Sequence, residues 1–155
     1  MNAIPLVRAS ILFPWLSFLN QIGSPTERFL SQAKLSIAIG QEPESLLSLY
    51  QSITFLENAA KFEGIATLGI VVGQRTPIHE LGAFGRVLCN SLTLFDLLVT
   101  IERTINMVNS GQRFSLRWEK DWVWLQHHCL GPAHIENLQS QRYCLMLFQL
   151  VAGFV

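Results

Sequence analysis

Residues 93–128 constrain the fold most, because the hydrophobic period changes within this stretch from that of a helix to that of a strand. Thr93 is suited to cap a helix, with Asp96 three residues later near the positive helix end. Gly111 is expected to end this helix, since glycine enters a left-handed C-cap without steric cost. Apolar residues between them recur at the i, i+3, i+4 spacing of one helical face: Leu94, Leu97, Leu98, Ile101, Ile105 and Val108.

Beyond Gly111 the apolar period is two, which predicts a β-hairpin. A loop with an even number of residues, such as Glu119-Lys120, puts the aliphatic residues of both strands on one face, as one-sided burial requires. We expect that face to bury Phe114, Leu116, Val123 and Leu125. The helix should contribute Leu97, Leu98, Ile101 and Ile105 to the same core. The opposite hairpin face then carries Arg113, Ser115, Arg117, Trp122, Trp124, Gln126 and His128.

Helix signals dominate the rest of the chain. We predict helices over residues 10–22, ended by Gly23, over 51–63, ended by Gly64, over 76–88, opened by Thr76-Pro77, and over 135–151. Ser24-Pro25-Thr26-Glu27 is a capping box that should start a short helix ending near Lys34. Residues 4–7 should be extended, while 46–50 and 65–72 fit either helix or strand. The predicted fold class is α+β, mainly helical, with an antiparallel hairpin packed against helices.

Composition narrows the function classes. At 155 residues the chain is expected to form one domain. Charged residues make up 14%, against roughly 25% in typical soluble domains. We therefore expect apolar surface to be buried against a partner, a missing segment or a ligand. Zero net charge without a Lys/Arg cluster speaks against direct nucleic-acid binding. The sequence contains no apolar run of about 20 residues, so no membrane span is predicted.

Candidate chemistry in the sequence is sparse. Three widely spaced cysteines, Cys89, Cys129 and Cys144, indicate reduced, buried thiols in a cytoplasmic protein. Adjacent His127 and His128 would point to opposite faces of a strand and could not share a metal ion. The sequence has no phosphate-binding loop and no nucleophile motif. We therefore predict that the chain is not an enzyme and uses neither a metal nor a cofactor.

The candidate binding site is the polar, aromatic face of the hairpin, comprising Arg113, Arg117, Trp122, Trp124 and Gln126. Guanidinium groups bind carboxylates through paired hydrogen bonds, and indoles cover apolar moieties, so an amphipathic carboxylate would fit. A neutral sugar would instead use Gln126 and Ser115. The alternative is a solvated sheet face on which Arg117 stacks on Trp122. If ligand binding did not depend on either arginine, the pocket would instead lie between the helices and residues 4–7.

Seven short motifs occur in one colinear order along nearly the whole chain. They are Ile4-Pro5-Leu6-Val7-Arg8-Ala9-Ser10, Phe18-Leu19-Asn20-Gln21-Ile22-Gly23-Ser24-Pro25, Phe55-Leu56-Glu57-Asn58-Ala59-Ala60, Leu68-Gly69 with Val72-Gly73, Leu81-Gly82-Ala83-Phe84-Gly85-Arg86, Ser110-Gly111-Gln112-Arg113-Phe114 and Val123-Trp124-Leu125. Together they resemble the N-terminal region of a large branch of AraC-type bacterial transcription regulators, often called the arabinose-binding-like domain.

The resemblance implies an effector-sensing and dimerising module, with DNA bound by a domain of two helix-turn-helix motifs. It does not imply arabinose, because members of this family sense different effectors. This sequence ends at Val155, before any helix-turn-helix. We therefore expect residues 1–155 to be a C-terminally truncated sensing domain with a small-molecule effector and a second copy as partners. The alternative hypothesis is a standalone interaction module that pairs with, or inhibits, a full-length regulator.

Overall fold

A computed structural model describes residues 4–129 and 137–152. The fold is mostly helical with two small antiparallel two-stranded sheets, which confirms the predicted α+β class. Within the described residues the elements are β1 (Leu6–Arg8), η1 (Ala9–Leu12), α1 (Phe13–Gln21), α2 (Thr26–Gln32), η2 (Ile37–Gln41), β2 (Leu46–Ser48), α3 (Leu49–Glu63), α4 (Leu68–Gln74), η3 (Ile78–Glu80), α5 (Gly82–Cys89), α6 (Leu94–Val108), β3 (Gln112–Glu119), β4 (Trp122–Cys129) and α7 (Leu138–Ala152). The elements named η are short 3₁₀ helices.

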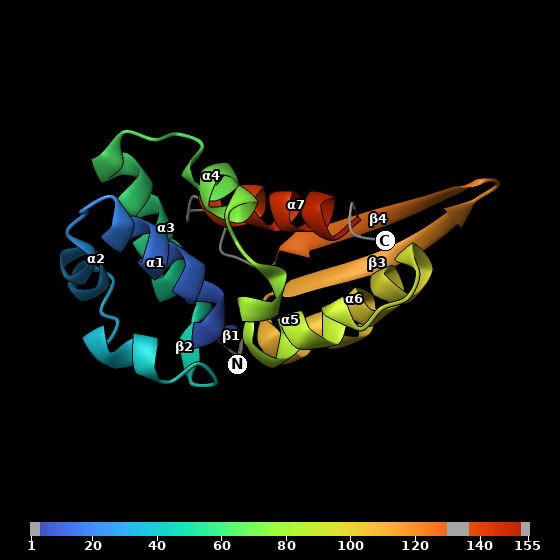
Figure 1. The fold of residues 1–155 in the computed structure, drawn as a ribbon, viewed down its shortest axis with the longest axis horizontal. Coiled ribbons are helices and arrows are strands. Elements are labelled where there is room, and N and C mark those ends of the chain that lie inside the picture. The colour runs from blue at the N-terminus through green and yellow to red at the C-terminus, as the bar shows by residue number, and fades with distance from the viewer. Residues whose placement is uncertain (1–3, 130–136, 153–155) are drawn as a thin grey trace.

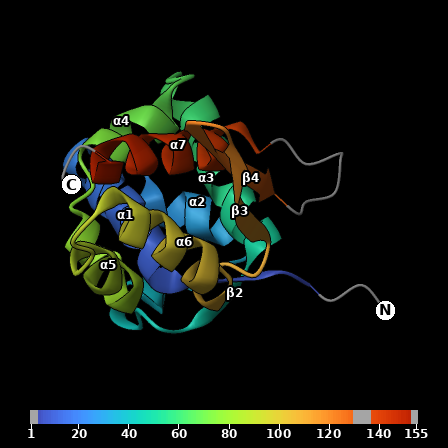
Figure 2. The ribbon, with the colours of Figure 1, turned by 90° about the vertical axis from the view of Figure 1, so that its right-hand side faces the viewer.

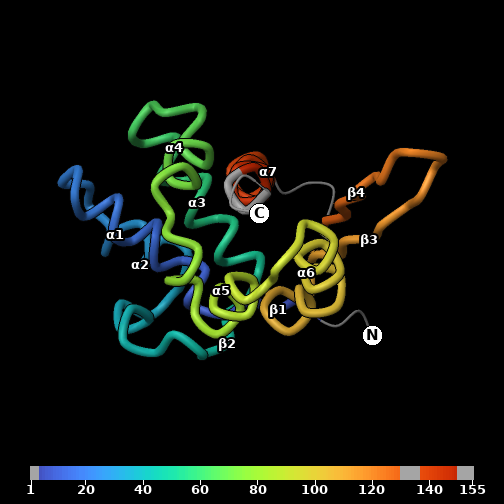
Figure 3. The backbone as a smooth tube through the Cα atoms, turned by 45° about the vertical axis from the view of Figure 1, so that its right-hand side comes forward, coloured from blue at the N-terminus to red at the C-terminus, as the bar shows by residue number. Residues whose placement is uncertain are grey.

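The helices form two groups joined by α7. Helices α1 to α4 lie together at one end, while α5, α6 and the β3–β4 hairpin lie at the other (Figure 1). In Figure 3, which looks roughly along the axis of α7, this helix lies between α3 and α4 on one side and α6 and the hairpin on the other. The view turned by 90° shows α7 running across the same side of the molecule as α4 (Figure 2). Helix α7 therefore contacts both groups. The predicted break at Gly131-Pro132 lies outside the described residues.

The N-terminal strand connects segments far apart in sequence. β1 pairs antiparallel with β2, which places Val7 opposite Leu47 and shows that residues 46–48 are a strand. On its other side, Val7 forms an isolated bridge with Asn109, and the Leu6 carbonyl accepts a hydrogen bond from the Ser110 backbone N–H at 2.9 Å. Leu6 and Val7 are extended, as predicted for residues 4–7. This strand is held by two partners far away in the sequence, β2 and the segment at Asn109.

Two of the predicted helix caps are wrong, and the helix predicted over 76–88 is divided into η3 and α5. Ser24 does not cap α2, because its hydroxyl donates a hydrogen bond to the Glu63 carboxylate at the end of α3. Helix α2 begins at Thr26 without a side-chain cap. Gly111 does not end α6, which stops at Val108 because Asn109 is drawn into an extended conformation (φ −145°) by its bridge to β1. The predicted roles of Gly23 and Gly64 are confirmed, with φ of 73° and 65°.

The start of α6 and the face assignment of the hairpin are confirmed. Thr93 Oγ1 accepts a hydrogen bond from the Asp96 N–H at 3.0 Å. The register pairs Leu116 with Leu125, so the predicted residues share a face. The two-residue loop is Lys120-Asp121, shifted by one residue from the expected loop, and Lys120 has a positive φ of 54°.

Burial along the hairpin falls off toward its tip, because the strands extend beyond the helical body (Figure 1). Phe114 is buried, Leu116 and Leu125 are half-buried, and Val123 is 39% exposed, so its predicted burial is wrong. On α6, the predicted core positions Leu97, Ile101 and Ile105 are buried, whereas Leu98 is only half-buried. Glu102 on α6 accepts a hydrogen bond from the Leu116 N–H, which ties the helix to the edge of β3.

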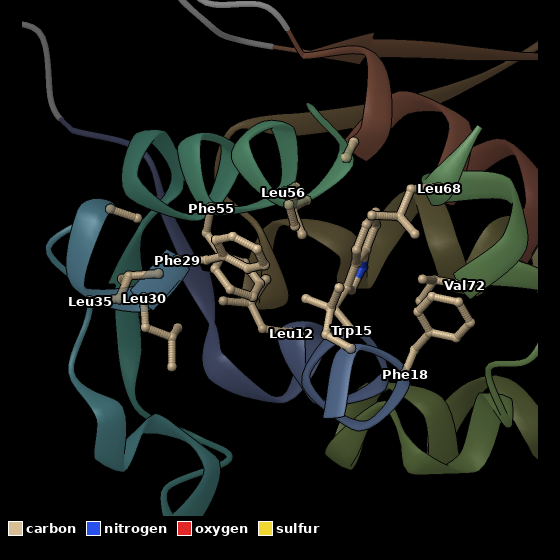
Figure 4. Packing of buried hydrophobic residues seen from close by; sticks show 14 of the residues in the cluster. Leu12, Trp15, Phe18, Phe29, Leu30, Leu35, Phe55, Leu56, Leu68 and Val72 are labelled. Atoms are coloured by element: carbon tan, nitrogen blue, oxygen red, sulfur yellow. The ribbon is translucent and has the colours of Figure 1, made fainter. Parts of the chain in front are cut away.

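The core comprises two main hydrophobic clusters. The first lies among α1 to α4 and includes Trp15, Phe55 and Leu68, which Figure 4 shows in close packing. The second joins α5, α6 and β3 through residues such as Ile101 and Phe114. Leu147 of α7 packs against both clusters. Among the described residues, no helix is sufficiently long and apolar to cross a membrane.

Candidate functional site

The outer face of the hairpin carries the five candidate residues predicted from the sequence. Arg113, Arg117, Trp122, Trp124 and Gln126 lie on one face and are all exposed, Trp122 at 72% and Trp124 at 55%. The register sets Arg117 opposite Trp124, while Trp122 lies opposite Glu119. The structure therefore brings these residues onto one open surface, and none of them lines the cavity inside the domain.

That cavity, here called the central cavity, lies at the junction of the two hydrophobic clusters and has a volume of about 70 Å³. Most of its wall is aliphatic or aromatic, and none of the described residues that line it is charged. The lining residues come from η1, α1, α3, η3, α5, α6, β3 and α7 and the residues next to them. They are Ile11, Trp15, Leu56, Ile78, Leu81, Phe84, Leu88, Ile101, Ile105, Val108, Asn109, Gln112, Phe114, Ser140, Tyr143, Cys144, Leu147 and Phe148.

Several polar side chains of the central cavity already have partners within the protein. The hydroxyls of Tyr143 and Thr76 share a hydrogen bond of 3.3 Å. Gln112 Nε2 donates to Cys144 Sγ at 3.2 Å, and Asn109 Oδ1 accepts from the Gly111 N–H at 3.0 Å. Burial raises the pKa of the Cys144 thiol to about 12 and also raises the pKa of Tyr143. Both groups are therefore neutral near pH 7.

Trp15 is the exception among these polar groups. Its side chain is fully buried, and the indole stands between Leu56 and Leu68 (Figure 4). The ring packs against Tyr143 with centroids 5.3 Å apart. Its Nε1 has no hydrogen-bond partner among the described residues. Buried N–H donors are nearly always paired in native proteins, so this unpaired donor in the cavity wall requires an explanation.

A second hollow, of about 200 Å³, lies beside the central cavity and shares Leu81, Phe84 and Val108 with it. It contains the ion pair between Arg8 and Glu44, whose Nη1 and Oε2 atoms are 3.3 Å apart. The Arg8 guanidinium also donates to two backbone carbonyls. The charged residues of this second hollow are therefore not among the three that it shares with the central cavity, and the described lining of the central cavity contains no charged residue.

Helix α7 is fixed at its start by a buried polar cluster. The Gln139 backbone N–H donates to the buried carboxylate of Glu57 at 2.8 Å. The Gln139 side chain accepts from the Gly69 N–H and donates to the Ala66 carbonyl, both at 2.9 Å. Because α7 also lines the central cavity, these bonds link α3 and α4 to the cavity wall.

The thiols differ from the prediction in burial. Cys89 is exposed, and Cys129 and Cys144 are half-buried; all three are free. Cys129 Sγ lies 3.8 Å from His127 Nε2, and burial raises the pKa of this thiol. Burial lowers the pKa of His127, and electrostatic repulsion from His128 lowers it further. The His127 ring stacks on Phe114 with the ring centroids 4.4 Å apart. A neutral thiol beside a neutral imidazole lacks the thiolate of a cysteine nucleophile.

Sequence reasoning missed the central cavity, because its lining comes from segments that no local pattern connects. Trp15 and Tyr143 resemble ordinary core residues in the sequence. The only available signals were the low charge content, which pointed to a ligand or partner, and the expectation of a pocket near residues 4–7. Within the described parts of the chain, no cluster of three or more potential ligands could hold a metal ion.

Comparison with known proteins places this fold in a family. The family model for the N-terminal arabinose-binding domain of AraC transcription regulators matches residues 23–155. A search of curated proteins finds no match. The matched region contains α2 to α7, the hairpin and most of the central cavity lining. The chain therefore belongs to the family of N-terminal, arabinose-binding-type domains of AraC transcription regulators.

Proposed function

We propose that this chain is the ligand-sensing portion of an AraC-type regulator and that its effector occupies the central cavity. The observation that carries the proposal is an uncharged cavity at the junction of two core clusters in a member of this family. Residues 1–155 act in this proposal as one sensing and dimerisation unit in the cytoplasm, without catalysis. A domain outside this chain binds DNA, in agreement with the zero net charge.

Helix α7 is the element best suited to transmit the signal. Tyr143 and Leu147 border the central cavity, while the start of the same helix is bonded to Glu57 of α3 and Gly69 of α4. An effector that binds more tightly to one position of α7 than to another shifts the equilibrium between them. The DNA-binding domain would read the position of α7.

Filling the central cavity tests this proposal. Ser140→Leu adds a bulky side chain at a buried cavity position of α7, whereas Gln141→Leu adds the same side chain at the next, exposed position. In a thermal-shift screen of small metabolites on the chain, Tm increases should disappear in Ser140→Leu and persist in Gln141→Leu.

Arg113→Ala and Arg117→Ala complete the screen, because the outer hairpin face is the alternative effector site. Ligands that raise Tm in both arginine variants but not in Ser140→Leu support the central cavity. If ligands fail to raise Tm in the arginine variants but still raise it in Ser140→Leu, the effector site lies on the outer face and the proposal is contradicted.

Self-association through the outer hairpin face is a second candidate function, favoured by the exposure of Trp122 and Trp124. Tryptophan is enriched where protein interfaces derive most of their binding energy. Light scattering at increasing concentration should give a mass approaching twice the 17.5 kDa of the chain. The double variant Trp122→Ser, Trp124→Ser should remain monomeric. A wild-type chain that stays monomeric at all concentrations would rule out this pairing.

A further inference from the structure

The chemistry of the central cavity restricts the effector further, on the assumption that the proposed function is right. A charged ligand would have to leave water for a site whose described lining residues offer no countercharge. The desolvation of an unpaired carboxylate or ammonium group is far too costly for such a site. The Cys144 thiol is neutral and cannot act as a counterion for a cation. The effector should therefore be uncharged.

A sugar also fits this cavity poorly. A pentose carries several hydroxyl groups, and each one buried without a partner loses its hydrogen bonds to water. The polar groups in the described lining are few: Tyr143, Gln112 and Asn109 are already bonded to protein groups, and Ser140 and Trp15 add one hydroxyl and one N–H. The apolar remainder of the wall offers nothing for the other hydroxyls to bind. The effector should therefore be mainly apolar.

Trp15 supplies a specific polar requirement. An indole Nε1–H is a donor only, so a partner must bring an acceptor atom. The side chain is buried and contributes to the cavity wall, and its Nε1 is itself buried without an acceptor among the described residues, so a ligand reaches this atom only when part of the wall moves. A carbonyl oxygen suits this donor, because it accepts a hydrogen bond and needs no donor in return. A molecule placing such an oxygen beside Trp15 would satisfy the buried N–H.

The volume limits the size of the effector. A cavity of about 150 Å³ lined by Leu, Ile and Phe holds benzene, and the central cavity has about half that volume. A ring-sized molecule therefore enters only if part of the wall moves. Phe84 and Phe148 are half-buried and line the cavity, so they can move at lower cost than the fully buried Trp15. Displacement of Phe148 would shift α7.

We propose that the central cavity binds a small, uncharged, mainly apolar molecule with a carbonyl-type oxygen that accepts a hydrogen bond from Trp15 Nε1. The family description names arabinose, but the lining of this chain is suited to a different chemical class. Shape complementarity to the aliphatic wall provides the affinity, and the indole N–H provides the selectivity for the oxygen.

Four probes with five-membered rings or five carbons test the proposal: cyclopentanone, methylenecyclopentane, cyclopentanecarboxylate and L-arabinose. The first two have nearly the same shape but differ in the acceptor oxygen. The chain has four tryptophans, so ¹H–¹⁵N spectra contain four indole N–H signals, and Trp15→Phe identifies that of Trp15. Cyclopentanone should shift this signal downfield to saturation and bind about tenfold more tightly than methylenecyclopentane.

Trp15→Phe provides the second measurement, since it keeps an aromatic wall but removes the donor. In this variant, methylenecyclopentane should bind more tightly than cyclopentanone, because the carbonyl oxygen would be buried without a donor. Trp124→Phe, at an exposed position, should keep the tenfold preference for cyclopentanone. If Trp15→Phe does not fold, the comparison of the two probes on the wild-type chain still decides the matter.

The outcomes separate this inference from the proposed function. Equal affinities of the two matched probes for the wild-type chain, or tighter binding of L-arabinose or the carboxylate, would overturn the proposed chemical class. The proposed chemical class would also be overturned if no probe moves the Trp15 signal while the metabolite screen yields ligands whose binding Ser140→Leu abolishes. The proposed function would survive that result. Probe binding that Ser140→Leu does not weaken would instead remove the central cavity as the site.

Discussion

Adding one methyl group at Gly85 is expected to lower the free energy of unfolding by roughly 3 kcal/mol or more, at the upper end of the cost of overpacking. A Cβ at this position would lie 2.9 Å from the carbonyl carbon of Ile78 and closer still to its oxygen. These are backbone atoms, so no change of side-chain rotamer can relieve the clash. Helix α5 would have to move away from η3 and open the second core cluster.

Urea denaturation of Gly85→Ala tests this expectation, with Gly40→Ala as the matched control. A Cβ at Gly40 would meet nothing within 4 Å, and its φ is not in the left-handed range. The control should therefore change the stability by about 0.5 kcal/mol or less. A Gly85→Ala protein as stable as the wild type would show that α5 does not pack against η3 as described.

Truncating Ile101 to alanine is expected to cost about 2–5 kcal/mol, the range for large-to-small substitutions in a close-packed core. Ile101 is fully buried in the middle of α6, within the second cluster and the lining of the central cavity. The deleted methyl and methylene groups no longer contribute their free energy of burial. The neighbouring side chains can fill the space that they leave only in part. The cost should approach the lower limit if Phe148 moves into the enlarged cavity.

Met107→Ala is the control on the same helix, because Met107 is 71% exposed. Alanine is also a better helix former than methionine, so this variant should be within about 0.5 kcal/mol of the wild type. Both free energies come from chemical denaturation followed by circular dichroism. A cost below about 1 kcal/mol for Ile101→Ala would place α6 outside the core.

Local patterns in the sequence predicted the elements whose formation depends mainly on near neighbours. The change of period after α6 identified the hairpin, because side-chain direction in a helix or strand follows directly from backbone geometry. Thr93 was recognised as a cap since its partner is the backbone of Asp96, three residues away. The even loop gave the correct faces for Leu116 and Leu125.

The failures occurred where a distant segment competes for a residue. Ser24 has the sequence context of a cap, but the Glu63 carboxylate, 39 residues away, takes its hydroxyl. Gly111 follows a helix, yet β1 draws Asn109 into a bridge before the glycine is reached. Val123 has the right alternation for burial, but the hairpin extends past the residues that could cover it.

The sequence by itself determined the α+β class, the helix-to-hairpin segment, the faces of the hairpin and the family to which the chain belongs. It put Arg113, Arg117, Trp122, Trp124 and Gln126 on one surface, where their binding role remains a prediction. Only the tertiary structure decided that a cavity lies between the two clusters and that Trp15, which lines it, has no hydrogen-bond partner for its Nε1 among the described residues. The reason is physical: the face of a strand follows from its own alternation, whereas a cavity is space that side chains from eight separate elements together fail to fill.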